Sequence, residues 1–282
     1  MIKVGLPVYN CLDRLPSIVK KIDSNSNLSK KIYIFDNTQE EQLTEQCKQI
    51  FQKLHATYLR HSENIGMIEN DVFARTYLSQ FNHVILHDDD ILEQNYFQEL
   101  HNSFKSSDAV LVIPGCQRFL EGKLWYVYDN PNYTQDDVYL RLRQVLLDSI
   151  YKPNSSEQFL YGLFRAHVFP KEMLWGRYRS IDILLLHVAS RGKVISAPRA
   201  VIKKHTNEEN IKKYSEHSYI KGTWLDAFPL ALRIRLAYSL RASGVVLRLN
   251  TMKIQQRLRL TILIWFHTVV AILSKLIYKL IK

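Results

Sequence analysis

The sequence of 282 residues has few cysteines and no internal repeat or low-complexity segment. Its three cysteines are odd in number, widely spaced and without any CxxC pair: Cys11, Cys47 and Cys116. Structural zinc sites normally take closely spaced pairs of such ligands. The cysteines therefore argue against structural zinc and fit a reducing compartment.

The first residues also lack the basic segment and apolar stretch of a cleaved export signal, and they begin directly as a strand. We therefore expect the N-terminal part of the protein to stay in the cytoplasm. The length suits one domain of about 210 residues with a substantial core, followed by a helical region. We predict these parts as residues 1–210 and 211–282.

Acidic residues are absent after Asp226. Residues 199–282 contain 16 Lys and Arg against 4 Asp and Glu, whereas residues 1–198 contain 22 against 23. The positive excess of the chain, +11 at pH 7, is therefore C-terminal. Because these basic residues are interspersed with Leu, Ile, Val, Trp and Phe, the sequence predicts basic amphipathic helices that bind an anionic surface.

An apolar run within this region favours phospholipid over nucleic acid. Residues 260–273 carry no Asp, Glu, Lys or Arg, and Trp265 and Tyr278 suit a headgroup boundary. The run has 14 residues, fewer than the roughly 20 that cross a bilayer as a helix. We therefore expect in-plane, peripheral binding to the inner face of the cell membrane and no nucleic-acid partner. The alternative is a helical interface in a homodimer.

The N-terminal half alternates short apolar runs with helix-like segments. The predicted strands are residues 2–6, 31–35, 56–59 and 81–86, and the predicted helices are residues 12–22, 40–54 and a segment through 73–78. Such alternation predicts an α/β fold with a mostly parallel sheet flanked by helices. The carboxyl ends of its strands should form one ligand crevice.

Three consecutive carboxylates, Asp88, Asp89 and Asp90, follow the apolar run 81–86 directly. Adjacent anions at the edge of a core repel one another and lose hydration, and a divalent cation is the usual compensation. Mn²⁺ or Mg²⁺ takes oxygen ligands and readily shares its coordination shell with a diphosphate, so a nucleotide diphosphate derivative is the expected ligand. The alternative is a solvated acidic turn that caps the next helix.

Four segments occur in an order and spacing that resemble the signature of the family 2 glycosyltransferases, which have the GT-A fold. They are VGLPVYN at residues 4–10, FDN at 35–37, NIG at 64–66 with Asn70, and LHDDD at 86–90. Each motif is weak alone, but together they cover about the first 95 residues. The resemblance extends to bacterial enzymes of surface-polysaccharide synthesis.

The resemblance implies roles for residues at the donor nucleotide. Pro7, Tyr9 and Asn10 would line the nucleobase pocket. Asp36 would accept a hydrogen bond from a pyrimidine. The alternatives are a turn and core packing for Pro7 and Tyr9, and a helix cap for Asp36. Three further positions of the motifs are expected to contact the donor: Asn64, Gly66 and Asn70.

The register of the acidic motif is ambiguous, because His87 occupies a position where many family members have the leading aspartate. We expect Asp89 to be the main metal ligand, with Asp88 and Asp90 contributing ribose and supporting contacts. In an extended chain, however, Asp88 and Asp90 would share a face and Asp89 would point across. All three therefore stay as predicted ligands.

Residues 106–210 resemble the acceptor half of the same family, after a donor half at residues 1–105. Residues 109–114 predict another strand, and the aromatic residues at 125–128 suit either a sugar or the core. Inverting transfer needs a carboxylate base. Asp182, ahead of the helix-like run 183–189, is the predicted base, and a helix cap is its alternative role; Glu157 is the second candidate.

Three basic side chains are candidates for the diphosphate or the metal. His205 is a candidate third metal ligand or diphosphate contact. Arg165 and Lys204 could neutralise the departing diphosphate, for which the fork of an arginine is well suited. All three could equally be ordinary surface residues.

The sequence thus predicts an inverting, metal-dependent glycosyltransferase. It would move a sugar from a nucleotide diphosphate donor, expected to be a UDP-sugar, to a glycan acceptor carried on lipid, in bacterial capsule, O-antigen or lipooligosaccharide synthesis. A nucleotidyltransferase is one alternative, but it would need a glycine-rich basic loop after the first strand, and residues 7–10 offer none. A non-catalytic membrane adaptor with the same fold is the other.

Overall fold

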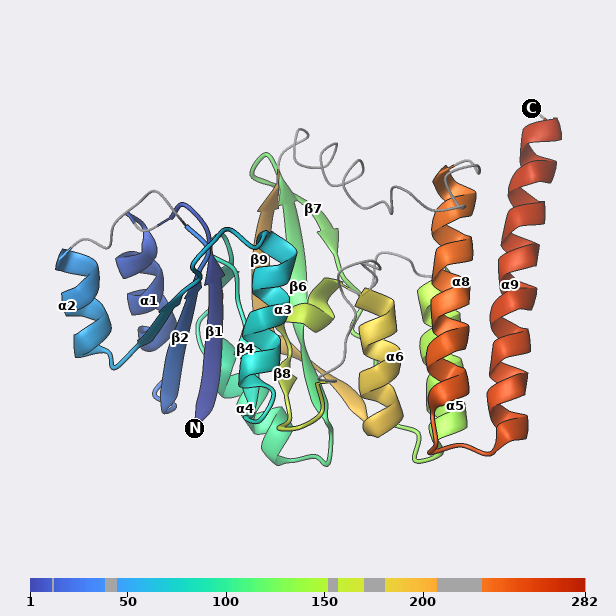
Figure 1. The fold of residues 1–282 in the computed structure, drawn as a ribbon, viewed down its shortest axis with the longest axis horizontal. Helices are drawn as coiled ribbons and strands as arrows, with labels where there is room; N and C mark the ends of the chain where they lie inside the picture. The colour runs from blue at the N-terminus through green and yellow to red at the C-terminus, as the bar shows by residue number, and fades with distance from the viewer. Residues whose placement is uncertain (12, 39–44, 152–156, 170–180, 207–229, 282) are drawn as a thin grey trace.

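A computed structural model describes residues 1–11, 13–38, 45–151, 157–169, 181–206 and 230–281. Within these residues nine strands form one sheet, whose main path runs β3-β2-β1-β4-β8-β6-β9-β5, with β7 paired to β6 (Figure 1). The predicted α/β class with a mostly parallel sheet is confirmed.

The N-terminal part of the sheet is parallel, as the alternating pattern predicts. Its strands are β1 (Ile2–Val8), β2 (Lys30–Asp36), β3 (Thr57–Arg60) and β4 (His83–Ile85). The helices between them are α1 (Leu15–Ser24), α2 (Glu45–Lys53) and α3 (Met67–Leu78). Helix α1 begins three residues later than predicted, with a proline in its first turn, where the missing N–H costs no hydrogen bond. Residues 12 and 40 themselves, where the first two helices are predicted to begin, lie outside the described residues.

The second part of the sheet contains strands of both directions. The short strand β8 (Leu163–Phe164) runs antiparallel between β4 and β6 (Leu111–Leu120). Strand β9 (Val194–Thr206) is parallel to β6, whereas β5 (Ile91–Leu92) and β7 (Lys123–Val127) pair antiparallel with β9 and β6. The other elements are α4 (Tyr96–Lys105), α5 (Val138–Tyr151), the 3-10 helix η1 (Glu157–Tyr161) and α6 (Ile181–Arg191).

Two large apolar clusters hold these layers together. The first packs β1 and β2 against α1 and α4, with Val4, Val19 and Phe97 fully buried. The second joins β6 to α5 and α6. Burial of apolar surface of this extent is the main stabilising term of such a fold.

The C-terminal helices belong to the second cluster. Helices α8 (Leu230–Arg248) and α9 (Ile254–Ile281) lie side by side, next to α5 and α6 (Figure 1). Ala242 and Val246 of α8 and Leu260 and Ile264 of α9 are buried with residues of α5 and α6. The helical prediction for this region is therefore confirmed where the structure describes it, and the core of the preceding residues continues into these helices. None of the described helices combines enough length with enough apolar sequence to cross a bilayer.

Candidate active site

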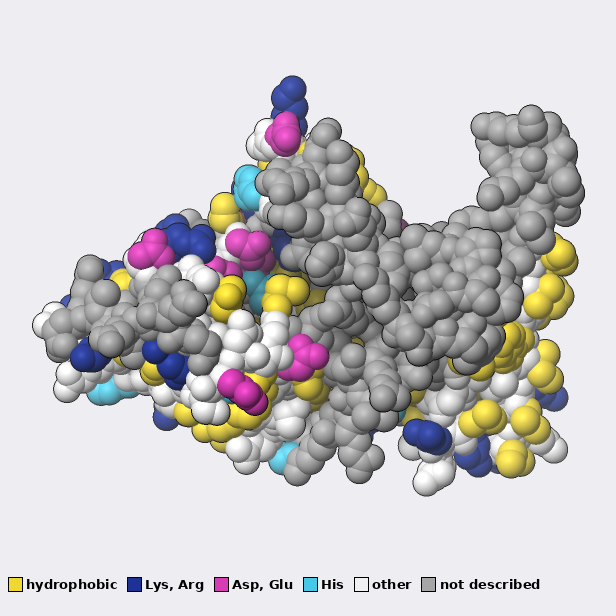
Figure 2. All heavy atoms as spheres, turned by 45° about the horizontal axis from the view of Figure 1, so that its top comes forward, with side chains coloured by type: hydrophobic (Ala, Val, Ile, Leu, Met, Phe, Trp, Pro, Cys, Tyr) yellow, Lys and Arg dark blue, Asp and Glu magenta, His cyan; other side chains and the backbone are white. Residues whose placement is uncertain are grey.

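The site lies at the edge of the sheet where β1, β2 and β4 end. Asn10 follows β1, Asp36 is the last residue of β2, and residues 87–90 follow β4. Because these strands are parallel, their carboxyl ends meet at one edge. Figure 2 brings this edge toward the viewer and shows acidic and basic side chains next to one another on it.

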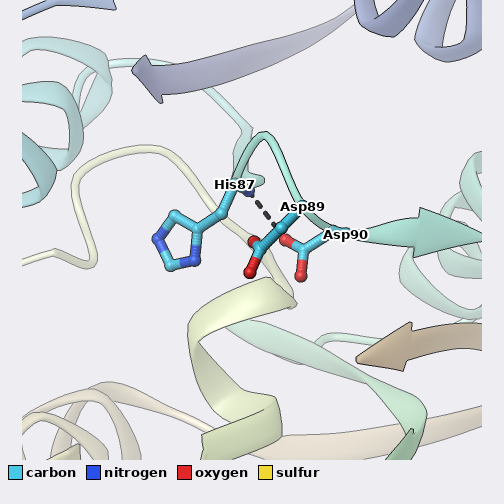
Figure 3. A group of neighbouring side chains, drawn as sticks. All are labelled: His87, Asp89 and Asp90. Carbon is cyan, nitrogen blue, oxygen red and sulfur yellow. Dashed lines mark hydrogen bonds between the residues drawn. The ribbon is translucent and has the colours of Figure 1, made fainter. Parts of the chain in front are cut away.

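Three side chains at the end of β4 could together hold a metal ion. Potential ligand atoms of His87, Asp89 and Asp90 all lie within 4.8 Å of one another (Figure 3). We call these residues the acidic group. The backbone N–H of His87 donates to Oδ2 of Asp90 at 2.7 Å, and this contact fixes the carboxylate.

The second oxygen of Asp90 is the strongest indication that the group could take a cation. Oδ1 is buried and accepts no hydrogen bond from the described residues. Burial raises the pKa of Asp90 to about 6, even though the nearby charges of Lys204 and His87 lower it. A buried carboxylate oxygen without a donor, beside the exposed carboxylate of Asp89, fits a hard divalent cation such as Mg²⁺ or Mn²⁺.

The acidic residues form a turn and not the extended chain that the alternation argument assumed. The N–H of Asp90 donates to the carbonyl oxygen of His87 at 3.3 Å, and residues 88 and 89 are turn residues. As a result Asp89 and Asp90 come together, and the expectation that Asp88 shares a face with Asp90 is wrong. Asp88 instead accepts a hydrogen bond from Arg14 at 3.1 Å, next to the buried thiol of Cys11. Its predicted contact with metal or ribose stays a prediction.

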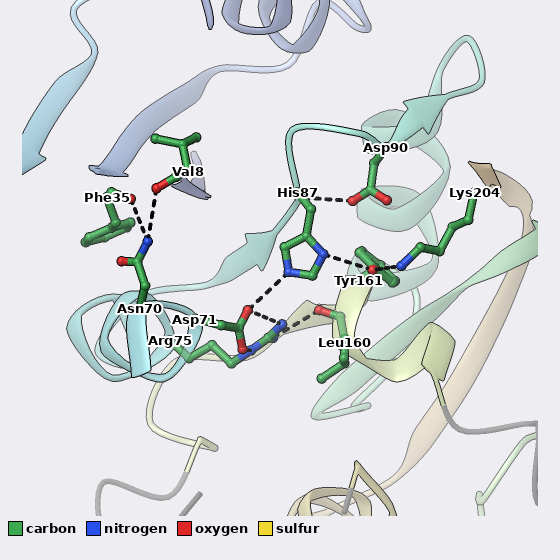
Figure 4. A network of polar contacts seen from close by, with 10 residues as sticks. All are labelled: Val8, Phe35, Asn70, Asp71, Arg75, His87, Asp90, Leu160, Tyr161 and Lys204. Carbon is green, nitrogen blue, oxygen red and sulfur yellow. Dashed lines mark hydrogen bonds and ion pairs between the residues drawn. The ribbon is translucent and has the colours of Figure 1, made fainter. Parts of the chain in front are cut away.

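Both ring nitrogens of His87 have protein partners. Nδ1 is 3.0 Å from the hydroxyl of Tyr161, and Nε2 is 3.4 Å from Oδ1 of Asp71 (Figure 4). Burial lowers the pKa of His87, but the hydrogen bond that its ring donates to Asp71 and the charges of Asp90 and Asp71 outweigh this and raise it. The carboxylates of Asp89 and Asp90 are therefore better placed to bind a cation than the ring.

A buried ion pair supports His87 from behind. Arg75, fully buried on α3, donates to Asp71 at 2.8 and 3.2 Å and to the carbonyl of Leu160 at 3.0 Å. Burial raises the pKa of Asp71, but the charge of Arg75 and the hydrogen bonds from His87 and Arg75 outweigh it and hold that pKa well below its usual range. Sequence reasoning missed this pair, although the i,i+4 spacing of opposite charges on a helix could have indicated it.

Asp36 is fully buried, and its oxygens are held by several donors. Oδ2 accepts from Nε of Arg60 at 2.8 Å and from the hydroxyl of Tyr58, while Oδ1 accepts from the N–H of Thr38 at 2.8 Å. The carboxylate therefore sits at the predicted nucleobase end of the sheet with three protein donors. Whether it also accepts from a pyrimidine stays a prediction.

The other predicted nucleobase residues lie at the end of β1. Pro7 is buried in the strand, Tyr9 is 51% exposed, and Asn10 has a left-handed backbone with φ 48°. The N–H of Asn10 donates to the hydroxyl of Thr38 at 2.8 Å, which ties the end of β1 to the loop after β2. Of the three side chains, those of Tyr9 and Asn10 are exposed at this edge, and their contacts with a nucleobase stay predictions.

The motif asparagines hold the loops of this edge together. The Asn64 side chain accepts from Asn37 Nδ2 at 2.7 Å and from the N–H of Gly66 at 2.9 Å, and Gly66 has φ 91° just before α3. Asn70 is buried and donates to the carbonyl oxygens of Phe35 at 2.9 Å and of Val8 at 3.4 Å (Figure 4). Asn64 and Asn70 thus position the strand ends, and the predicted donor contacts of Asn64, Gly66 and Asn70 stay predictions.

Arg165 and His205 are not brought to the acidic group. Because β8 is antiparallel, Arg165 leaves the sheet at the opposite edge, where Nε donates to the carbonyl of Ala109 at 2.9 Å. Its guanidinium lies over the Phe104 ring, 4.1 Å from the centroid. The exposed ring of His205, near the end of β9, stacks on Phe119 with centroids 5.0 Å apart. The structure therefore gives no support to Arg165 as a diphosphate contact.

The two predicted bases are Asp182 and Glu157, and the structure describes the backbone of each but not its side chain. Asp182 is the second residue of α6, so the expected position at a helix start is confirmed for its backbone. Glu157 begins η1. The role of Asp182 as catalytic base stays a prediction.

The sequence and the overall fold are similar to those of known glycosyltransferases. Residues 3–170 match the model of glycosyl transferase family 2. Among solved structures, S. aureus TarS 1–349 is similar with a TM-score of 0.58 at 9% identity, over 91% of this chain and 68% of that one. Its complexes with UDP and with UDP-GlcNAc give TM-scores of 0.57 and 0.54 at 11% identity, over 91% of this chain and 68% and 69% of theirs. A search of curated protein sequences gave no significant match.

These findings define the class of the protein as a GT-A glycosyltransferase. The chain belongs to glycosyl transferase family 2, because the family model covers more than half of it.

Proposed function

We propose that this glycosyltransferase moves a sugar from a UDP-sugar to the hydroxyl of a glycan acceptor with inversion of configuration. The single observation that carries the donor assignment is the buried Oδ1 of Asp90, to which none of the described residues donates, at the edge where Asp36 and Tyr9 also lie. A UDP-sugar is the donor that best fits this edge, and the structurally similar TarS has been solved in complex with UDP and with UDP-GlcNAc.

The acidic group would hold Mn²⁺ or Mg²⁺ through Asp89 and Asp90. A bound cation would neutralise the charge that develops on the diphosphate as it leaves. Asp36 and Tyr9 would fix the nucleobase end of the donor.

The transfer itself is a single displacement. The acceptor hydroxyl oxygen attacks the anomeric carbon, the bond from that carbon to the diphosphate oxygen breaks on the opposite face, and UDP leaves with the bonding electrons. A carboxylate takes the proton of the hydroxyl, and we assign this role to Asp182 in the first turn of α6.

We also propose that α9 attaches the enzyme to a membrane at its periphery, on the cytoplasmic side. Leu260, Ile264 and Thr268 face the protein and are buried. Exposed apolar side chains run along the opposite side of the helix, where Figure 2 shows a row of hydrophobic side chains. They are Ile254, Leu258, Ile262, Phe266, Val269, Val270 and Leu273, which we call the α9 stripe.

Charge favours an anionic bilayer over a second copy of the chain as the partner of the α9 stripe. The region after Asp226 holds only basic charges, so two copies would repel one another, whereas anionic headgroups would attract each copy. An enzyme held there would meet acceptors carried on lipid, as bacterial surface-polysaccharide synthesis requires.

Turnover of nucleotide sugars by the purified chain tests the proposal. With Mn²⁺ present, the wild type should bind and hydrolyse or transfer from at least one UDP-sugar, and Asp90→Asn should lose this activity while it stays folded. If the wild type turned over no nucleotide sugar, a non-catalytic adaptor would be the better account.

A further inference from the structure

Lys204 reaches the acidic group from a distant part of the sequence. It lies on β9, whereas the acidic group follows β4, and β9 pairs with β5 directly after that group. The ammonium of Lys204 donates to the hydroxyl of Tyr161 and lies over its ring, 4.6 Å from the centroid (Figure 4). Its positive charge acts on Asp90, whose pKa it lowers.

Tyr161 is held rigidly at this point. Its side chain is fully buried, its hydroxyl also shares the 3.0 Å hydrogen bond with Nδ1 of His87, and its carbonyl accepts from the hydroxyl of Tyr96 at 2.5 Å. The rings of Tyr161 and His87 meet edge to face, with centroids 5.4 Å apart. His87 is in turn held by Asp71 on α3. These linked contacts therefore fix the direction of the Lys204 side chain on β9.

Ordinary packing does not require a series of polar contacts from Asp71 through His87 and Tyr161 to Lys204. A lysine on a strand rim is normally free to extend into water, and ordering it costs side-chain entropy. Here the hydroxyl and ring of Tyr161, which His87 holds in turn, order it beside a carboxylate that binds a cation under the proposed function. A diphosphate held by that cation would bring its oxygens to the ammonium, and lysine binds phosphate as a compact point charge.

We propose that Lys204 binds the diphosphate of the donor and stabilises it as it leaves, and that Tyr161 and His87 are positioning residues that aim Lys204. This inference rests on the proposed function, because it takes UDP as the leaving group. When the bond to the sugar breaks, the electrons go to the diphosphate oxygen, and the ammonium stabilises that charge without giving up a proton.

The affinities for UDP and for uridine separate this role from a structural one. Uridine has the nucleobase and ribose but no phosphate, so only UDP should depend on Lys204. In calorimetric titrations we expect Lys204→Met to weaken UDP binding about 10- to 100-fold, with uridine binding unchanged. Lys204→Arg keeps the charge and should keep most of the UDP affinity.

Lys203→Met is the matched control. Lys203 is the preceding residue of the same strand, points to the other face and forms an ion pair with Glu93. This variant should bind UDP and uridine like the wild type.

A double-mutant cycle tests the positioning role of Tyr161. Tyr161→Phe removes one hydroxyl and keeps the buried ring, and it should weaken UDP binding less than Lys204→Met does. If Tyr161 acts through Lys204, the double variant should be no weaker than Lys204→Met alone.

Three results would overturn the inference. They are unchanged UDP affinity in Lys204→Met, an equal loss of UDP and uridine binding, and losses from Tyr161→Phe and Lys204→Met that multiply in the double variant. A wild-type chain that bound neither UDP nor uridine would instead contradict the proposed donor itself, so the two failures are distinguishable.

Discussion

Arg60 donates from Nε to Oδ2 of Asp36 across 2.8 Å, and the carboxylate is fully buried while the arginine is partly exposed. A buried carboxylate loses its hydration and depends on its donors for compensation. The hydroxyl of Tyr58 also donates to Asp36. Burial and this contact together raise the pKa of Tyr58 well above its usual value. The predicted nucleobase end of the site is therefore built around one compensated charge.

Removal of Arg60 should destabilise the protein. In Arg60→Met the carboxylate of Asp36 keeps Tyr58 and the N–H of Thr38 but loses its counter-charge. We expect a loss of about 1–3 kcal/mol in the free energy of unfolding, measured by urea denaturation. Arg14→Met is the control, because the pair of Arg14 with Asp88 is more exposed and should be worth less than about 1 kcal/mol. Equal effects of the two changes would contradict this account of Asp36.

Asp90 should reduce the stability of the metal-free protein at neutral pH. Its pKa in the folded state is about 6, above the ordinary value of 3.8. Above pH 6 the carboxylate is ionised in both the folded and the unfolded state, so its burial on folding costs free energy. As the pH falls from about 6 to 4, the folded state takes up the proton first and this cost disappears.

Asp90→Asn should therefore stabilise the metal-free protein by about 1–3 kcal/mol at pH 7.5 and by much less at pH 4. Denaturation curves in the presence of a chelator would measure the difference at each pH. Asp13→Asn changes an exposed carboxylate and should show no such gain. If the variant were less stable than the wild type at pH 7.5, the claim that the buried charge of Asp90 destabilises the folded protein would be refuted.

Single charges in the α9 stripe should abolish membrane binding without unfolding the protein. Ile262→Glu and Phe266→Glu place a carboxylate on a face that is more than half exposed. We expect both to lose co-sedimentation with vesicles that contain phosphatidylglycerol, while Leu124→Glu on β7 retains it. Binding of the wild type should weaken at high salt. Retention of both α9 variants on vesicles would refute the assignment, and a wild-type dimer that these changes dissociate would favour a second copy as the partner.

Deletion of the C-terminal helices is a poor test of membrane binding through α9. Ala242, Val246, Leu260 and Ile264 are buried against α5 and α6, so a truncated chain would lose part of its core.

Two glycines should respond oppositely to alanine. Gly66 has φ 91°, and a Cβ there would lie 2.8 Å from Oε2 of Glu69, so Gly66→Ala should cost about 1 kcal/mol or more. Gly244 lies inside α8 with open space around a built Cβ, so Gly244→Ala should add about 0.5–1 kcal/mol. Thermal unfolding of both variants would measure this. A stabilised Gly66→Ala would mean that the loop before α3 relaxes freely.

The parallel half of the sheet could be predicted from sequence, because each of its strands is a compact apolar run between helix-like segments. The site edge followed, since Asp36 and residues 87–90 come directly after such runs. Strand β8 could not be predicted. It has only two residues, Leu163–Phe164, and its direction is fixed by pairing with β4 and β6 rather than by any local pattern. The position of Arg165 away from the acidic group, which gives its predicted diphosphate contact no support, results from this strand.

The details of the acidic group also depended on tertiary contacts. An extended chain was assumed for residues 88–90, but a hydrogen bond between His87 and Asp90 closes a turn and changes which carboxylates meet. Tyr161 and Lys204 approach His87 from η1 and β9, which lie 74 and more residues further along the chain. No spacing in the sequence indicates such a contact.

A crystal structure with UDP and Mn²⁺ tests the central claim most directly. The account predicts Mn²⁺ bound to Asp90, with Asp89 beside it, and two diphosphate oxygens completing its coordination at the carboxyl edge of β4. Manganese and UDP bound elsewhere, with Oδ1 of Asp90 still without a partner, would contradict it.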